Sequence, residues 1–283
     1  SGGCLPPLMT PSPHRLSVAP MMDWTDRHCR YFHRLLTRHA LLYTEMVTTG
    51  ALRHGDVLRH LRFNAEEHPV ALQRDAVSIP VTVKHRIGVD QVESYDFVRD
   101  FVGQVAQAGC QVFIVHARNA WLQGLSPKEN REIPPLRYEL VYRLKQDFPD
   151  LTIVINGGVT DNDQIADHLK SVDGVMLGRE SYYRPWLMTE WDARFCGDAH
   201  VDLPEREAIE EAMVVYMERA QAEDGCPWYA IARHMLGLYH GMRGARLWRQ
   251  VWSDHRLKPL PPREVWRQAR AVMAQSQEPR FAA

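Results

Sequence analysis

Cysteine is scarce in this sequence, and the cysteines that occur are widely spaced. The 283 residues include five of them, Cys4, Cys29, Cys110, Cys196 and Cys226. They are too scattered for the disulfide framework of a small secreted protein, and none forms the Cys-x-x-Cys pair that is typical of a zinc site. A cytoplasmic location fits this pattern best.

Long apolar runs and an excess of one charge are also missing. No segment approaches the roughly 18 apolar residues that span a bilayer, and the start, Ser1–Pro13, lacks the apolar core of a signal peptide. We therefore expect no membrane partner and a disordered lead-in over residues 1–13. Because 34 Lys and Arg nearly balance 35 Asp and Glu, only the distribution of charge can indicate a polyanionic partner.

From Leu16 onward, short apolar runs alternate with longer amphipathic ones, which is typical of a parallel sheet covered by helices. Seven strands are predicted, at Leu16–Pro20, Leu41–Val47, Val70–Gln73, Val81–His85, Gln111–His116, Thr152–Asn156 and Gly174–Leu177. Helices are predicted at Ser94–Ala108, Arg137–Lys145 and Asp161–Leu169. The first of them places Phe97, Val98, Phe101, Val102 and Val105 on one stripe and stops at Gly109, a C-terminal glycine cap.

The eighth strand of a closed barrel is absent from this pattern. A parallel TIM (β/α)8 barrel has eight strands in about 250 residues, but strand Val70–Gln73 is followed by only six residues, Arg74–Ile79, before Pro80 begins the next strand. A parallel crossover needs a dozen or more residues, and a tight antiparallel hairpin, the alternative, is disfavoured because the linker has neither Gly nor Asn. We therefore predict an α/β fold, a TIM-type barrel domain over 14–195, in which about two βα units, roughly 50 to 60 residues, are absent between Gln73 and Arg74.

The chain after Arg194 has only helical patterns, beginning near Pro204. Between Arg233 and Arg270 it has nine Lys and Arg against two acids, a local net charge of +7. Leu247, Trp248, Val251 and Trp252 form an apolar stripe, and Arg246, Arg249 and Gln250 fall on the opposite face of the same helix. We predict an all-helical domain over 204–283 that packs by one side and exposes arginines on the other.

Two glycine turns follow the last two barrel strands, where ligand-binding loops of this fold lie. Asn156-Gly157-Gly158 and Gly178-Arg179 can form a phosphate cradle, because bare backbone N–H groups approach an anion closely and Arg179 adds charge. The alternative for each is a simple tight turn. Their combination on these two strands favours phosphate.

Three further strand ends have polar side chains that suit a flavin. Lys84 lies on an otherwise apolar strand, so its ammonium needs an anion or polar ligand, such as the flavin edge that gains negative charge on reduction. His116 ends a neighbouring strand and could bind the same cofactor, or be a satisfied core histidine. Gln73 can donate to and accept from a pyrimidine edge, or instead close the barrel mouth through a hydrogen bond.

The stretches Ser17–Arg30 and Tyr43–Gly50 closely resemble the opening of A-type tRNA-dihydrouridine synthases, and the resemblance continues over nearly all of Leu16–Trp252. It implies a cytoplasmic, monomeric enzyme that uses NADPH and FMN to reduce a D-loop uridine of tRNA to dihydrouridine. By the same resemblance, FMN is held by Pro20, Met21, Met22, Gln73, Lys84, His116, Asn156, Gly157, Gly158, Gly178 and Arg179. Contacts with tRNA are implied at Lys128, Arg131, Arg246 and Arg249.

One departure from the family is as informative as the match. The family's fourth strand ends in an Asn-x-Asn-x-Gly-Cys-Pro motif whose cysteine is the catalytic proton donor, and this sequence passes directly from Gln73 to Arg74. Gly225-Cys226-Pro227 repeats the tripeptide in the helical region with no strand before it, and Cys110 precedes a strand instead of following one. We therefore expect no catalytic residue within the chain, the proton donor belonging to the missing segment.

Two other functions remain open at this point. A flavin barrel that reduces a small molecule would have the same strand ends, but a basic helical domain would serve no purpose in it. The second alternative is a catalytically impaired flavoprotein that still binds tRNA, because the given sequence lacks the catalytic cysteine.

Overall fold

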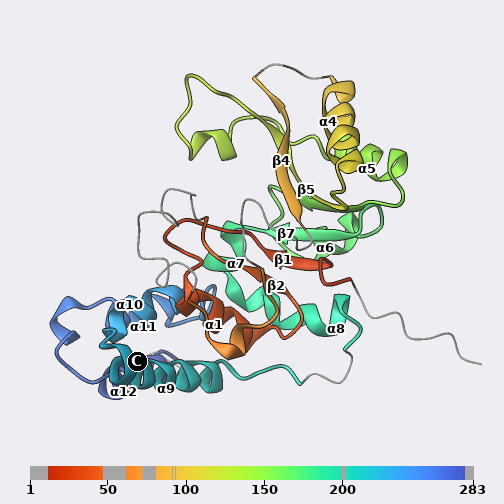
Figure 1. Cartoon of the computed structure of the whole chain (residues 1–283). Helices are drawn as coiled ribbons and strands as arrows, with labels where there is room; N and C mark the ends of the chain where they lie inside the picture. The colour runs from red at the N-terminus through yellow and green to blue at the C-terminus, as the bar shows by residue number, and fades with distance from the viewer. Residues whose placement is uncertain are drawn as a thin grey trace, which may run out of the picture.

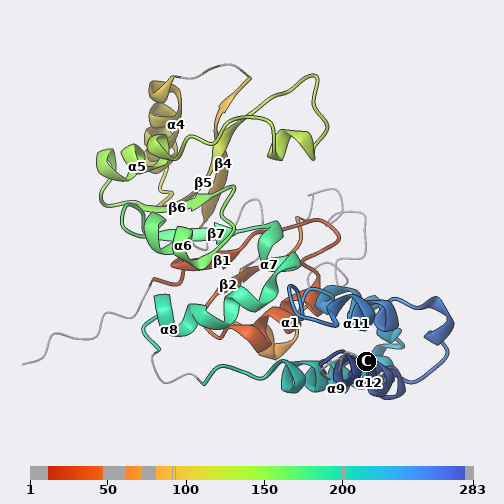
Figure 2. The same cartoon turned by 180° about the vertical axis from the view of Figure 1, so that it is seen from behind.

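The computed structural model describes residues 12–46, 62–71, 81–90, 92, 94–198 and 202–277. A twisted sheet with helices along one side occupies most of this part, and the C-terminal helices pack together beyond α1 and α7 (Figures 1 and 2). The predicted lead-in, except for its last two residues, lies outside the described residues, as do Gln73 and Arg74.

Seven parallel strands form one sheet, as the sequence predicts. They are β1 (Leu16–Val18), β2 (Leu41–Tyr43), β3 (Val70–Ala71), β4 (Thr82–Val89), β5 (Val112–Ala120), β6 (Thr152–Asn156) and β7 (Gly174–Leu177). The spatial order is β3-β2-β1-β7-β6-β5-β4, so the first and last strands pair as in a closed barrel, whereas β3 and β4 are edges. The sheet is thus a TIM-like barrel that is open, within the described residues, at the position of the predicted missing strand.

Side chains on the two faces of the sheet enter two separate apolar clusters, as the two-residue period of a strand requires. The inner cluster consists of Ala19, Leu41, Tyr43, Ile114, Val154 and Met176. Its members come from β2 and from β5 to β7, so the sheet curls around them. The outer cluster, which includes Leu42, Phe113 and Ile155, packs against the helices.

The predicted helices at 94–108, 137–145 and 161–169 are confirmed. The α-helices are α1 (Arg27–Leu36), α4 (Tyr95–Gln107), α5 (Tyr138–Asp147), α6 (Asn162–His168), α7 (Arg179–Tyr183), α8 (Trp191–Phe195), α9 (Arg206–Asp224), α10 (Trp228–Ala232), α11 (Ala245–Trp252) and α12 (Pro262–Gln277). The short 3₁₀ helices are η1 (Ala65–Glu67), η2 (Glu129–Arg131), η3 (Pro185–Glu190), η4 (Arg233–Met235) and η5 (His255–Leu257). Gly109 has φ +104° after α4, which explains why a glycine ends that helix.

The apolar stripe predicted for α4 is only half buried. Val98 and Val102 are fully covered, but Phe97 and Phe101 are 48% and 39% exposed. In the described residues β4 has no neighbour on its outer side, so α4 lacks the adjacent βα unit against which the second half of its stripe would pack.

Strands β4 and β5 run further than the sequence predicts. After a register shift between Arg86 and Gly88, the pair continues through Gly88 with Asn119 and Val89 with Ala120. Gly88 in the β4 extension and Arg118 and Asn119 in the β5 extension interrupt the apolar pattern from which the strands were predicted. They form a two-stranded projection that Figure 1 shows rising above the rest of the sheet.

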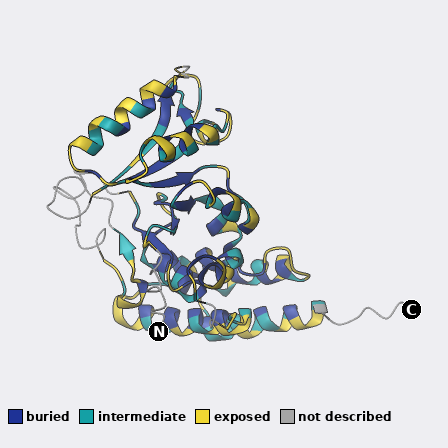
Figure 3. Cartoon of the chain, turned by 90° about the vertical axis from the view of Figure 1, so that its right-hand side faces the viewer, coloured by how far each residue is buried: buried dark blue, intermediate teal, exposed yellow. Residues whose placement is uncertain are grey.

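The C-terminal helices have their own buried centre, the carboxylate of Glu210 on α9. Its oxygens accept hydrogen bonds from the indole N–H of Trp248 (2.7 Å) and Trp252 (3.0 Å) of α11 and from the hydroxyl of Tyr239 (3.1 Å). Figure 3 shows the buried and exposed sides of these helices. The predicted stripe is confirmed for the two tryptophans, but Leu247 is 48% exposed because it faces a surface hollow. Within the described residues, no helix is both long and apolar enough to cross a membrane.

Candidate functional site

The carboxyl ends of β4, β5, β6 and β7 place polar groups at one level of the inner face. Arg86 pairs in register with His116, His116 with Asn156, and Asn156 with Met176. Lys84 pairs with Ile114, a member of the inner cluster, so the Lys84 and Arg86 side chains both belong to the inner face. We call this rim, together with the loop after β1, the barrel mouth.

The mouth is electropositive, and burial together with these positive charges lowers the pKa values of Lys84 and His116. Loss of hydration among the surrounding protein atoms, with repulsion from Arg86, lowers the pKa of Lys84 to about 8. Burial, followed by the charges of four cations, lowers the pKa of His116 to about 3, so the imidazole is neutral at pH 7. Those cations are Lys84, Arg86, Arg118 and Arg131. Such a cluster favours an anionic ligand.

The Gly157–Gly158 turn needs glycine for two reasons. Both residues have positive φ, +112° and +71°, and a Cβ atom on Gly157 would lie only 2.5 Å from Cδ2 of His116. The Gly157 carbonyl accepts a hydrogen bond from the Tyr138 hydroxyl (2.7 Å). The turn therefore presents bare backbone directly beside the His116 ring.

The second glycine turn and the loop after β1 are adjacent. The Ala19 amide donates to Leu177 (2.7 Å), and Pro20 is buried behind it whereas Met22 is exposed. Gly178 precedes α7, and the first residue of that helix, Arg179, forms an ion pair with Glu132. The structure thus brings every predicted cofactor-binding residue that it describes to the mouth, with Gln73 outside the described residues.

The β5–α5 loop (residues 121–137) carries Lys128 and Arg131, both exposed. Sequence reasoning missed the two arginines that hold it. Arg86 donates to the carbonyls of Asn119 and Asn130, both at 2.8 Å, and Arg118 donates to those of Glu132 (3.0 Å) and Pro134. The available signal was their spacing in the sequence, because Arg86 follows Lys84 by two residues and Arg118 follows His116 by two residues.

A second group that sequence reasoning missed joins the mouth to the C-terminal helices. Asp26 caps α1 by accepting from the amides of His28 and Cys29, and it also accepts from His234 (3.0 Å) and Arg233 (3.2 Å). Burial raises the pKa of Asp26, but the hydrogen bond and charge of His234 outweigh it and hold that pKa below its ordinary value. Asp26 therefore fixes the loop after β1 against η4.

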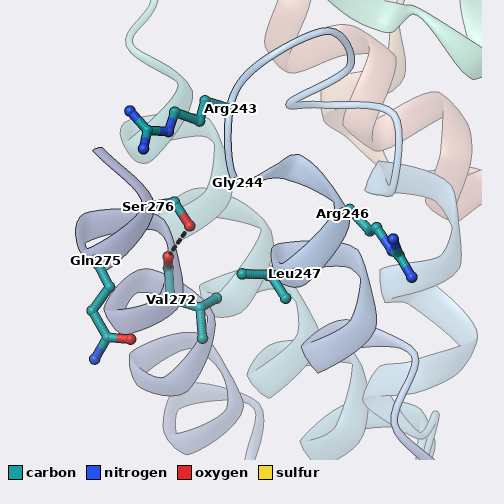
Figure 4. A pocket seen from close by; sticks show the side chains of 7 residues that line it. All are labelled: Arg243, Gly244, Arg246, Leu247, Val272, Gln275 and Ser276. Atoms are coloured by element: carbon teal, nitrogen blue, oxygen red, sulfur yellow. Dashed lines mark hydrogen bonds between the residues drawn. The ribbon is translucent and has the colours of Figure 1, made fainter. Parts of the chain in front are cut away.

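Arg246 and Arg249 lie on α11, Arg246 exposed and Arg249 partly covered. A hollow of about 340 Å³ beside them is lined by Arg243, Gly244, Arg246, Leu247, Val272, Gln275 and Ser276. Figure 4 shows Arg243 and Arg246 on opposite sides of it, with the Ser276 hydroxyl bonded to the Val272 carbonyl (2.7 Å). The hollow belongs to the surface of the helical region and contains no mouth residue.

No thiol among the described residues reaches the mouth. Cys29 is buried in α1, where burial raises its pKa well above the ordinary value, and Cys110 contacts backbone carbonyls before β5. Cys226 lies between α9 and α10, 3.6 Å from Nε2 of His28. The expectation that the proton donor belongs to the missing segment stays a prediction.

Comparison with known proteins identifies the family. The model described as "Dihydrouridine synthase (Dus)" matches residues 17–74 and 73–265. The chain belongs to the dihydrouridine synthase family. Proteins named tRNA-dihydrouridine(20/20a) synthase from Pseudomonas putida and Yersinia pestis are 45% and 44% identical to it, over 90% and 93% of this chain and 93% and 92% of their own lengths. The Vibrio vulnificus protein of the same name is 44% identical over 92% of this chain and 97% of its own.

These matches also bear on the predicted junction. The family model aligns in two segments that meet at Gln73 and Arg74. The alignment with the Pseudomonas putida protein extends over 313 positions, more than the 283 residues of the whole chain. Part of the relative therefore has no counterpart here.

Solved structures of mandelate oxidase cover 92% of this chain and 71% of their own, at 12% identity and a TM-score of 0.26. A likeness this low adds nothing to the family assignment.

Proposed function

We propose that this protein is a tRNA-dihydrouridine synthase that binds FMN at the barrel mouth and uses NADPH to reduce a uridine in the D-loop of tRNA. The observation that carries the proposal is the convergence of cations around a neutral His116 at the strand ends of a barrel of this family. Bound FMN, once reduced, would supply the hydride for the C5–C6 double bond.

The residues present suit this cofactor. Within the described part of the chain, neither Lys84 nor His116 has a hydrogen-bond or ion-pair partner, and the buried Nε of Arg118 has no acceptor. A buried donor without an acceptor is costly, so an electron-rich ligand is expected to satisfy the Nε of Arg118, with the exposed ammonium of Lys84 and the half-buried ring of His116 beside it. The backbone N–H groups of the Gly157–Gly158 turn would donate hydrogen bonds to the phosphate, together with Gly178 and Arg179.

The rest of the chain suits an RNA substrate. A base inside folded tRNA must be extruded to reach the mouth. Lys128 and Arg131 on the β5–α5 loop and Arg246 and Arg249 on α11 would hold phosphates and orient the RNA. A flavin reductase of small molecules would need none of these cations.

Protonation at C5 needs an acid. We propose that this acid is the cysteine of the segment absent between Gln73 and Arg74. The second candidate is a catalytically impaired flavoprotein that still binds tRNA. The absence of this segment from the given sequence favours it.

Two measurements test these proposals. Titration of the chain with FMN should give a yellow protein with a saturable flavin spectrum, and a labelled tRNA transcript should bind at low salt. A protein that takes up no FMN would refute the cofactor assignment, whereas FMN uptake without tRNA binding would favour the small-molecule alternative.

A further inference from the structure

Three aromatic rings from two distant parts of the sequence form a cluster beside the mouth. Trp24 stacks on Tyr182, with ring centroids 4.6 Å apart and planes 20° apart. It also meets Tyr183 edge to face at 5.2 Å. Tyr183 is 50% exposed, so one large aromatic surface remains open to a ligand.

The cluster lies next to the residues proposed to bind the cofactor. Tyr183 is the last residue of α7, and Arg179 is the first, so they are four residues apart on one helix face. The rise along the axis between them is only about 6 Å. Trp24 follows Met22 and Asp23, and Asp23 has φ +64°, a left-handed turn that brings the indole back over α7.

The same cluster borders the helical region. The Tyr182 hydroxyl is 3.2 Å from Nδ1 of His234 and 3.4 Å from the Arg233 carbonyl. In both views α7 lies between the sheet and helices α1 and α11 (Figures 1 and 2). RNA that spans the α11 arginines and the mouth would therefore pass the exposed ring. The neighbouring cations are Arg184, which is paired with Glu180, and Arg233, which is paired with Asp26.

We propose that Tyr183, supported by Trp24 and Tyr182, is a stacking platform for the nucleobase next to the extruded uridine. Aromatic rings among cations are the usual means of holding unstacked bases, because every base has a π face and the flanking phosphates are anionic. Extruding the target exposes a face of its neighbour, and Tyr183 replaces the lost stacking partner. This inference rests on the proposed tRNA substrate.

The test measures binding of an unmodified tRNA transcript by fluorescence anisotropy at several salt concentrations. Tyr183→Ala and Tyr183→Leu should each raise Kd roughly 5- to 100-fold, the range of one base–aromatic stack, whereas Tyr183→Phe should stay within about twofold of the unmodified protein because the ring remains. The slope of log Kd against log salt should not change, because no phosphate contact is lost. Phe97→Ala, a matched loss of a half-exposed ring on α4, should have no effect.

A second arm identifies the base. An abasic site on either side of the target uridine should weaken binding to the unmodified protein and have no further effect on Tyr183→Ala. Equal affinities for Tyr183→Ala, Tyr183→Leu and Phe97→Ala would overturn the platform, as would an equal loss in Tyr183→Phe. Absence of tRNA binding by the unmodified protein would instead refute the proposed function.

Discussion

The pKa of Lys84 links the chemistry of one residue to the pH dependence of ligand binding. In the ligand-free protein the ammonium loses its proton near pH 8, below the 10.5 of an ordinary lysine. It is therefore charged at neutral pH and uncharged above about pH 8. An anion at the mouth would feel this change directly.

We expect FMN affinity to fall as the pH rises through about 8, and Lys84→Met to abolish this dependence. At pH 7 the variant should bind FMN roughly 10- to 100-fold more weakly, from the ~1.5–3 kcal/mol of a hydrogen bond to a charged group. The stability of the ligand-free protein should change the opposite way, rising between about pH 8 and 10.5, because the unfolded chain holds the proton more tightly. Flavin fluorescence titration measures the affinity, and Lys128→Met is the control. An unchanged pH profile in Lys84→Met would show that another group controls binding.

In the helical region, Glu210 is the buried charged residue on which the neighbouring helices converge. Burial raises its pKa, although three hydrogen bonds from Trp248, Trp252 and Tyr239 oppose the rise. Glu210→Ala should lower the free energy of unfolding by roughly 3–5 kcal/mol, because it leaves buried donors without an acceptor. Urea unfolding measures this, and Glu211→Ala, an exposed neighbour on α9, should stay within ~0.5 kcal/mol of the unmodified protein. Similar losses in the two variants would mean that Glu210 is not the organising contact.

At the scale of elements, the β5–α5 loop and α11 would act on RNA in different ways. The loop takes its shape from Arg86 and Arg118, which hold its carbonyls to β4 and β5. Helix α11 takes its position from the tryptophans bonded to Glu210. We expect the loop to act through the positions of its side chains and α11 to act through its charge. The salt dependence of tRNA binding distinguishes the two, because its slope changes only when a phosphate contact is lost.

Arg118→Lys keeps the positive charge and loses the paired donation to the carbonyls of Glu132 and Pro134. We expect weaker tRNA binding with an unchanged salt slope, and faster amide hydrogen exchange confined to residues 121–137. Exchange as slow as in the unmodified protein would show that Arg118 does not hold the loop.

Replacing Arg246 and Arg249 by Ala should flatten the salt dependence of tRNA binding by roughly 0.7–0.9 in log–log slope for each lost phosphate contact. FMN affinity should not change, because α11 lies outside the mouth. Arg256→Ala, which removes a largely exposed arginine paired with Asp254, is the control. An unaltered slope in the double variant would require another role for α11.

At the scale of the whole molecule, the sheet formed by the described residues is open between β3 and β4, and we expect this opening to limit both stability and activity. The sheet curls around its inner cluster. The apolar stripe of α4 stays half exposed because, within the described residues, no neighbouring βα unit covers it. Pairing both edges would remove unsatisfied strand groups and bury that stripe.

Inserting a relative's segment between Gln73 and Arg74 should raise the free energy of unfolding and reduce the exposure of Phe97 and Phe101. With NADPH and FMN, dihydrouridine formation in tRNA should rise about 10²–10⁴-fold, the usual contribution of a general acid. The assay compares the chain with and without the segment at matched FMN loading. Equal activity would show that the placement of the catalytic acid in the missing segment is wrong.

Local patterns in the sequence were sufficient for the number of strands, three covering helices and the two glycine turns, and they indicated the break at Gln73–Arg74 where the family model divides, but they did not give the full length of β4 and β5. Each depends on residues close together along the chain: the period of two or 3.6, a glycine at positive φ, or a linker too short for a crossover. The cofactor-binding residues were predicted because parallel strands bring their carboxyl ends to one rim, and their roles stay predictions.

Only the tertiary structure showed how Arg86 and Arg118 hold the loop, how Asp26 meets His234, and how Trp24 stacks on Tyr182. The partners in the last two pairs are more than 150 residues apart in the sequence. No periodicity relates such partners, since their contact depends on how β1, β7 and the C-terminal helices pack in three dimensions.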